Sequence, residues 1–175
     1  MRRECLFCNS FKKNKEQGLI IFENTNAYSI LNYKPSVPGH SLIIPKQHIT
    51  NLRKLTGNTL EDIIQAIPET FDKLLIIYDS KPELISNYYK SLIIAPPEPE
   101  SKQFAQFMLK HPLLHNRPIS YNWGMNYGYE AGQRERHLHI HLFPRNENGL
   151  GIATAMRNLL QINTQNLSEN LRDNF

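Results

Sequence analysis

The amino-acid sequence predicts a single α+β domain built around a mostly antiparallel sheet. Three observations support this fold class. Short apolar segments separated by turn-forming residues in the first third of the chain indicate neighbouring strands. A longer segment then repeats its apolar residues every three or four positions, which is typical of a helix with one buried face. The 175 residues are enough for one domain with a sizeable core.

The first strands lie close to the N-terminus. Residues 19–22 and 27–31 are mostly apolar and predict two strands joined by a turn at residues 24–26. Residues 41–44 predict a third strand, which Pro45 ends because proline cannot donate a ladder hydrogen bond.

A helix follows the third strand. We expect it to begin with Thr59 as its N-cap and with Asp62 in its first turn. Pro68 lies inside the periodic segment and is expected to kink the helix or divide it in two. Its apolar positions recur at helical spacing: Leu60, Ile63, Ile64, Ile67, Phe71, Leu74, Leu75 and Tyr78.

Residues 80–118 are interpreted as an insertion within one domain that spans residues 1–175. Fewer than about 40 residues can hardly enclose a core of their own, so a second domain is not expected. The segment contains a proline-rich connector at residues 95–100, and Ser101 is a possible cap for a short helix after it.

The last part of the chain predicts two more strands and a short helix. Residues 119–126 and 136–143 have strand patterns, and residues 128–132 between them predict a turn. Apolar residues at helical spacing then indicate a short C-terminal helix: Ala153, Met156, Leu159 and Leu160.

Three histidines alternate along the last predicted strand. Residues two apart on a strand share a face, so the imidazoles should project together, away from the apolar side chains between them. Crowded, buried imidazoles are hard to protonate and add little to a core, which favours metal binding or phosphate chemistry. The histidines are His137, His139 and His141, and the apolar residues are Leu138, Ile140 and Leu142.

The two cysteines, Cys5 and Cys8, form a CxxC motif near the N-terminus. A thioredoxin-like redox pair would lie between a strand and a helix, and no strand is predicted before this motif. Half of a zinc site is the better interpretation, provided that two more ligands come from elsewhere in the chain.

The composition is that of an ordinary globular protein. The net charge of +4 and the pI of about 9.1 are compatible with an anionic ligand, but the lysines and arginines are scattered. No apolar run approaches the roughly 20 residues that a membrane span needs, and none has the length of a signal-peptide core. We expect a cytoplasmic protein with no membrane partner and no nucleic-acid partner.

Two longer segments, residues 32–48 and 126–145, resemble the histidine triad (HIT) family of nucleotide hydrolases and transferases. The likeness covers the CxxC motif, about residues 19–52 and residues 122–145, including His-x-His-x-His with the preceding Ala-Gly-Gln and the following Pro-Arg. The resemblance implies a HIT-like fold, with a five-stranded antiparallel sheet, a long helix and a short C-terminal helix. It also implies a homodimer.

The resemblance is strongest to the fragile-histidine-triad branch, whose members cleave dinucleoside polyphosphates. Nucleoside phosphoramidases of the family usually have an acidic residue at the position of Asn32, whereas some adenylyl-transferring relatives share the asparagine. A phosphoramidase or an adenylyltransferase therefore remains an alternative. A non-catalytic nucleotide-binding module is another, although the presence of His139 argues against it.

His139 is the expected nucleophile, because a neutral imidazole can attack phosphorus and form a nucleotidyl-histidine. Its other ring nitrogen should donate to a carbonyl group, which would leave the attacking nitrogen free. The resemblance implies that further groups stabilise the charge on the phosphoryl oxygens: His141, His40, Gln133 and Asn126. For Asn126 and Gln133, ordinary turn hydrogen bonding is the alternative role.

The resemblance also implies that Asn32 binds the ribose. Arg134 departs from the family pattern, because relatives commonly have a small hydroxyl residue there. It could bind a longer phosphate chain with its guanidinium group, or it could point to solvent. Polyphosphate substrates would arrive with bound Mg²⁺.

The zinc-carrying members of the family imply a closed site formed by Cys5, Cys8, His48 and His137, with a structural role. One competing interpretation treats the three alternating histidines as ligands of a catalytic metal. Same-face residues on one strand lie about 6.6 Å apart, so a third imidazole would reach a common ion with difficulty.

Overall fold

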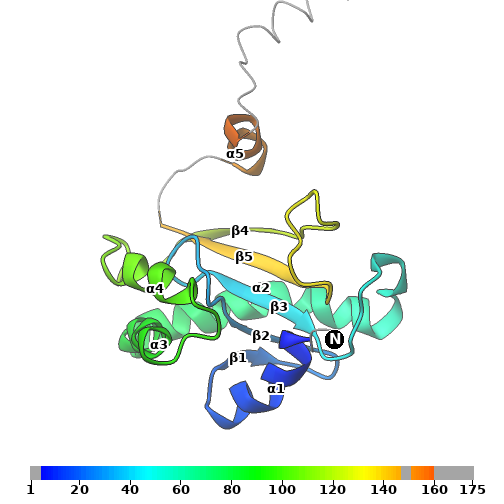
Figure 1. The fold of residues 1–175 in the computed structure, drawn as a ribbon, viewed down its shortest axis with the longest axis horizontal. Helices are drawn as coiled ribbons and strands as arrows, with labels where there is room; N and C mark the ends of the chain where they lie inside the picture. The colour runs from blue at the N-terminus through cyan, green and yellow to red at the C-terminus, as the bar shows by residue number, and fades with distance from the viewer. Residues whose placement is uncertain (1–4, 147–150, 160–175) are drawn as a thin grey trace, which may run out of the picture.

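A computed structural model of the chain describes residues 5–146 and 151–159. Its centre is one five-stranded antiparallel sheet in the order β1-β2-β3-β5-β4 (Figure 1). This confirms the predicted α+β fold with a five-stranded sheet. The strands are β1 (Ile20–Glu23), β2 (Ala27–Leu31), β3 (Ser41–Pro45), β4 (Ser120–Gly124) and β5 (Ile140–Arg145).

Helices surround this sheet. The long helix α2 packs across β1, β2, β3 and β5, while α3 and α4 pack against each other at one end of the sheet (Figure 1). The helices are α1 (Leu6–Glu16), α2 (Gly57–Ser80), α3 (Glu83–Ile94), α4 (Ser101–Leu109) and α5 (Ile152–Leu159), with a 3₁₀ turn at Leu52–Lys54. None of the helices in the described segments is long and apolar enough to cross a bilayer.

The alternation of side chains along the strands divides the core between the two faces of the sheet. Ile43 packs in the larger cluster, with residues of α2, α3 and α4. Its neighbours Leu42 and Ile44 point the other way and pack against Phe7 of α1. Leu138, Ile140 and Leu142 are all buried in the larger cluster, so the neighbouring histidines face the side of α1.

The long helix differs from the prediction in two ways. It begins at Gly57, with Thr56 as the N-cap, so the assignment of Thr59 as the cap was wrong. The first turn is exposed, and apolar periodicity therefore could not reveal it. The helix also continues through Pro68 rather than dividing there. Pro68 and Ile64 are exposed, so water can satisfy the carbonyl group that the proline leaves without a partner.

Two helices were not predicted from the sequence. Helix α1 buries only Phe7, which gives too few apolar positions for a periodic signal. Helix α3 does carry a usable signal, because its buried residues Ile85, Tyr89 and Leu92 follow helical spacing. The expected short helix after the connector is present as α4, although its N-cap is Glu100 rather than Ser101.

The histidine strand is shorter at its start than predicted. Hydrogen-bonded pairing of β5 begins at Ile140 and continues to Arg145, so His137 and His139 precede the strand. The reason is that the N–H of Leu138 donates to the carbonyl of Ile49, 2.8 Å away, rather than to β3. At the C-terminus, α5 agrees with the predicted helix, and Leu160 lies outside the described residues.

Candidate active site and metal centre

A cavity of about 1300 Å³ lies beside the histidine strand. It collects residues that are far apart in the sequence, from α1, the β2–β3 loop, the α3–α4 connector, β4 and β5. Six of the predicted site residues line it: His139, His141, His40, Asn32, Asn126 and Arg134.

His139 is held with one ring nitrogen free. Its Nδ1 lies 2.9 Å from the carbonyl oxygen of His137, and a carbonyl can only accept, so Nδ1 carries the proton. Nε2 therefore keeps its lone pair. Burial lowers the pKa of His139, which favours the neutral ring that a nucleophile requires. The structure thus has the nitrogen-to-carbonyl contact expected from the sequence.

His40 and His141 form a directed pair. The backbone N–H of Ser36 donates to Nδ1 of His40 at 3.1 Å, so the proton of a neutral His40 must be on Nε2. That Nε2 lies 3.1 Å from Nδ1 of His141 and donates to it. Consequently Nε2 of His141 carries the remaining proton. This atom is buried and lacks a hydrogen-bond partner among the described residues.

Both rings of this pair are neutral at pH 7. Burial lowers the pKa of His40 well below its usual range, and the neighbouring His141 and His139 lower it further. Burial likewise lowers the pKa of His141 to about 4. The pair can therefore offer a hydrogen bond from Nε2 of His141 to a ligand without a resident positive charge.

Two of the amide residues are already engaged within the protein. The Oδ1 atom of the buried Asn32 accepts a hydrogen bond from the N–H of Lys34 at 2.9 Å. Gln133 uses Oε1 to accept from the N–H of Gly128, at 2.9 Å, and Nε2 to donate to the carbonyl of Arg136, at 3.2 Å. Gln133 is not among the residues that line the cavity, and its hydrogen bonds close the turn before the histidines.

Arg134 lies on the cavity wall with an aromatic partner. Its guanidinium carbon is 4.6 Å from the ring centre of Tyr129, which is typical of a cation–π contact. Arg134 lines the cavity, whereas Tyr129 does not. Stacking of this kind leaves the hydrogen-bonding edge of the guanidinium plane available to an anion.

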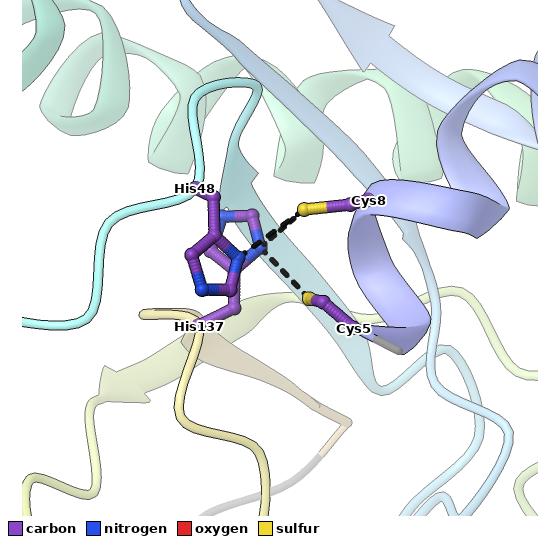
Figure 2. A group of neighbouring side chains, drawn as sticks. All are labelled: Cys5, Cys8, His48 and His137. Carbon is purple, nitrogen blue, oxygen red and sulfur yellow. Dashed lines mark hydrogen bonds between the residues drawn. The ribbon is translucent and has the colours of Figure 1, made fainter. Parts of the chain in front are cut away.

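The four predicted metal ligands come together at the N-terminal end of α1 (Figure 2). Cys5 and Cys8 lie at the start of this helix, His48 follows β3, and His137 precedes β5. The Sγ of Cys5 is 3.4 Å from Nδ1 of His137, and the Sγ of Cys8 is 3.2 Å from Nδ1 of His48. All four ligand atoms lie within 4.8 Å of one another.

The donor set and its surroundings fit a metal such as zinc. Two thiols and two imidazoles are a usual ligand set for a closed tetrahedral zinc site. Nε2 of His137 donates to the carbonyl of Pro45 at 3.0 Å, which leaves Nδ1 facing the sulfur atoms. A backbone carbonyl on the second ring nitrogen is the arrangement that normally orients a metal-binding histidine.

The sequence prediction missed Phe7, the residue that connects the two sites. Its buried ring lies edge-on to His137, with ring centres 5.9 Å apart, and edge-on to His139, at 5.1 Å. It also lines the cavity. Its position between the two cysteines was the available signal, because any metal bound by Cys5 and Cys8 must fix the residues between them.

Comparison with known proteins gives a family match over most of the chain. A family model described as the HIT domain matches residues 13–148. An uncharacterized HIT-like protein of Mycoplasma genitalium is 29% identical over 170 residues, which cover 95% of this chain and 88% of that protein.

Two relatives have named activities. The adenosine 5'-monophosphoramidase HNT1 of Candida albicans is 24% identical over 151 residues, covering 86% of this chain and 76% of that protein. An AP-4-A phosphorylase of Mycobacterium tuberculosis is 26% identical over 131 residues, covering 74% of this chain and 48% of that protein. The chain thus matches only about half the length of the phosphorylase.

Proposed function

Because the chain belongs to the HIT family, we propose that it is a nucleotide hydrolase that works through a nucleotidyl-His139 intermediate, with dinucleoside polyphosphates as the favoured substrates. The observation that carries this proposal is the hydrogen bond from Nδ1 of His139 to the carbonyl of His137. It leaves a neutral nitrogen nucleophile in the wall of a cavity large enough for a nucleotide.

In the proposed first step, Nε2 of His139 attacks the α-phosphorus. The bond from phosphorus to the bridging oxygen breaks, and the leaving group departs with that electron pair. In the second step water attacks the same phosphorus, the phosphorus–nitrogen bond breaks, and the mononucleotide is released. The proton lost by the water passes to solvent, and His139 regains its lone pair.

The charge that grows on the phosphoryl oxygens needs donors already in place. Nε2 of His141 is suited to this role, because it is buried, carries a proton and has no partner among the described residues. His40 supports it from behind by donating to Nδ1 of the same ring. Asn126 also lines the cavity and is proposed as a second donor, with Asn32 on the ribose.

When zinc is bound by Cys5, Cys8, His48 and His137, it supplies a structural cross-link between α1 and the segment before β5. His137 is then fixed. Its carbonyl oxygen, which accepts the hydrogen bond from Nδ1 of His139, holds that ring in place. Mg²⁺ is proposed to enter with a polyphosphate substrate rather than as a resident ion.

The named relatives supply the alternatives. One is called an adenosine 5'-monophosphoramidase, a name for cleavage of a phosphorus–nitrogen bond, and another an AP-4-A phosphorylase, a name for cleavage of a polyphosphate by phosphate. Two observations favour a polyphosphate leaving group in this chain. Asn32 replaces the acidic residue usual in phosphoramidases, and Arg134 places a cation on the cavity wall.

The test is mononucleotide release from diadenosine triphosphate and from adenosine phosphoramidate by the purified protein. We expect cleavage of the dinucleotide, and its loss in His139→Ala with nucleotide binding retained. His115→Ala, a change at an exposed histidine outside the cavity, should cleave normally. Cleavage of the phosphoramidate alone would assign the protein to the other branch. Turnover retained by His139→Ala would rule out the mechanism. Nucleotide binding by the wild type without cleavage of either substrate would favour a non-catalytic binding module.

We also propose a homodimer in which the sheet continues through β4. This strand is at the edge of the sheet, and Trp123 on it is 45% exposed. An edge strand with unpaired backbone groups can pair with a second copy. Light scattering on the wild type would test this, and a monomeric wild type would contradict it.

A further inference from the structure

The segment interpreted as an insertion contacts the loop that carries His40. Helix α3 and the connector after it lie at the end of the sheet where β2 passes into β3 (Figure 1). The β2–β3 loop, residues 32–40, contains two residues of the proposed site, Asn32 and His40. Hydrogen bonds and ion pairs connect residues 83–100 to Leu31 just before this loop, to Lys34 near its start and to Gly39 near its end.

Tyr89 holds the end of the loop next to His40. Its side chain is fully buried, and its hydroxyl oxygen accepts a hydrogen bond from the N–H of Gly39 at 3.0 Å. Gly39 has a φ of +76°, and a Cβ there would lie 3.2 Å from the hydroxyl of Tyr78 and from Cγ of Pro144. The backbone at Gly39 is therefore confined, and Tyr89 satisfies its only donor.

This contact lies one residue from the paired histidines. Gly39 is followed by His40, whose ring accepts from Ser36 and donates to His141. A shift of the backbone at Gly39 would move the ring of His40 relative to Nδ1 of His141. Because His40 donates to Nδ1 of His141, this contact keeps the proton of His141 on Nε2. Tyr89 therefore acts on His141 through His40.

Tyr88, the preceding residue of α3, holds the other end. Its hydroxyl donates to the carbonyl of Leu31 at 2.9 Å, one residue before Asn32. The two ends are joined by the N–H of Asn32, which donates to the carbonyl of His40 at 2.8 Å. Near the start of the loop, Lys34 pairs with two connector residues, Glu98 and Glu100, and its Nζ is 2.8 Å from Glu100.

We propose that residues 83–100 brace the β2–β3 loop, with Tyr89 as a positioning residue for His40 and His141 and Tyr88 as a positioning residue for Asn32. The catalytic part of this inference rests on the proposed function. It assigns the inserted segment a role inside the active site rather than at a partner-binding surface. The two neighbouring tyrosines act on different steps: Tyr89 on turnover and Tyr88 on nucleotide binding.

Tyr89→Phe and Tyr88→Phe form a matched pair, because each removes one hydroxyl from the same helix and keeps the ring. For Tyr89→Phe we expect kcat to fall about three- to tenfold, with KM within about twofold of wild type. For Tyr88→Phe we expect KM to rise about three- to tenfold, with a smaller change in kcat. The assay uses diadenosine triphosphate well below the unfolding temperature of both variants.

The imidazole nitrogen signals of His40 provide a readout that does not need turnover. In ¹⁵N NMR spectra, Tyr89→Phe should shift these signals and speed exchange of the Nε2 proton, whereas Tyr88→Phe should shift them less, because it reaches the ring only through Asn32. Unchanged His40 signals together with unchanged kcat in Tyr89→Phe would overturn the proposal. So would equal effects of both variants on kcat and KM, because they would indicate general loosening. If the wild type cleaves neither nucleotide, the proposed function fails, and the NMR comparison still decides whether Tyr89 positions His40.

Discussion

The ring of Phe7 meets the ring of His139 edge-on, with 5.1 Å between their centres. Phe7 belongs to the segment between the two cysteines, and its carbonyl is held by the hydroxyl of the buried Tyr28 at 2.9 Å. The proposed metal centre and the proposed nucleophile therefore share a wall. Whatever fixes the start of α1 also fixes the surroundings of His139.

Cys8→Ser should remove bound metal and destabilise the protein. A ligand that binds only the folded state stabilises it by mass action, so its loss should lower the melting temperature by at least about 5 °C. Nucleotide affinity should fall as well, because Phe7 would no longer be held in the cavity wall. Metal analysis, calorimetry and a binding titration measure the three effects. Lys13→Ser, at an exposed position of the same helix, is the control. Unchanged metal content and melting temperature in Cys8→Ser would show that the zinc site is wrong.

Stability should fall as the solution is acidified, in part because of His141. Burial lowers its pKa from 6.5 to about 4 in the folded protein, so the unfolded chain binds a proton more readily between these values. The contribution is complete above about pH 6.5 and is lost as the pH falls toward 4. Within that window each pH unit lowers the free energy of unfolding by up to about 1.4 kcal/mol for this histidine.

Urea unfolding of the wild type and of His141→Leu, compared between about pH 7 and about pH 5, measures this contribution. The variant should lose less stability over that range than the wild type does. His115→Leu, at an exposed histidine, should follow the wild type. Equal pH dependence in the wild type and in His141→Leu would contradict the prediction.

Arg134 should select the leaving group. The measured quantity is the kcat/KM for diadenosine triphosphate divided by that for adenosine phosphoramidate, since both substrates share the adenylyl unit. Arg134→Gln should lower this ratio at least about tenfold, because a charged hydrogen bond to the additional phosphate is lost. Tyr129→Leu should lower it about two- to fivefold, and Tyr129→Phe should retain it, because the phenyl ring still stacks on the guanidinium group.

Arg117→Gln is the matched control for this comparison, since Arg117 pairs with Asp79 away from the cavity. Equal losses for both substrates in Arg134→Gln would mean that Arg134 acts on the shared adenylyl unit. Unchanged kcat/KM values for both substrates in Arg134→Gln would mean that Arg134 contributes to neither reaction.

Features that depend on near neighbours in the chain were predictable. The first three strands follow from apolar segments with turn residues between them, and the structure contains all three, with β2 paired to both β1 and β3. The common face of His137, His139 and His141 follows from the two-residue period of extended chain. The four metal ligands were found through family resemblance, because nothing local relates Cys5 and Cys8 to His48.

Helices with little periodic signal were not predictable in the same way. Helix α1 contributes one buried side chain, so tertiary packing rather than its own pattern identifies it. The start of β5 was placed too early for a related reason. Leu138 has the alternation of a strand residue, yet its N–H is bonded to Ile49, and only the folded chain shows which partner it has.

The sequence by itself determined the first three strands, the common face of the histidines and the chemical types of the ligands, because these depend on residue spacing and on side-chain chemistry. Tertiary structure alone decided which nitrogen of His139 is free, which way His40 donates to His141 and which loop Tyr89 holds. These contacts join residues up to about a hundred positions apart. Their directions depend on backbone groups that come into reach only when the strands and helix α3 pack together.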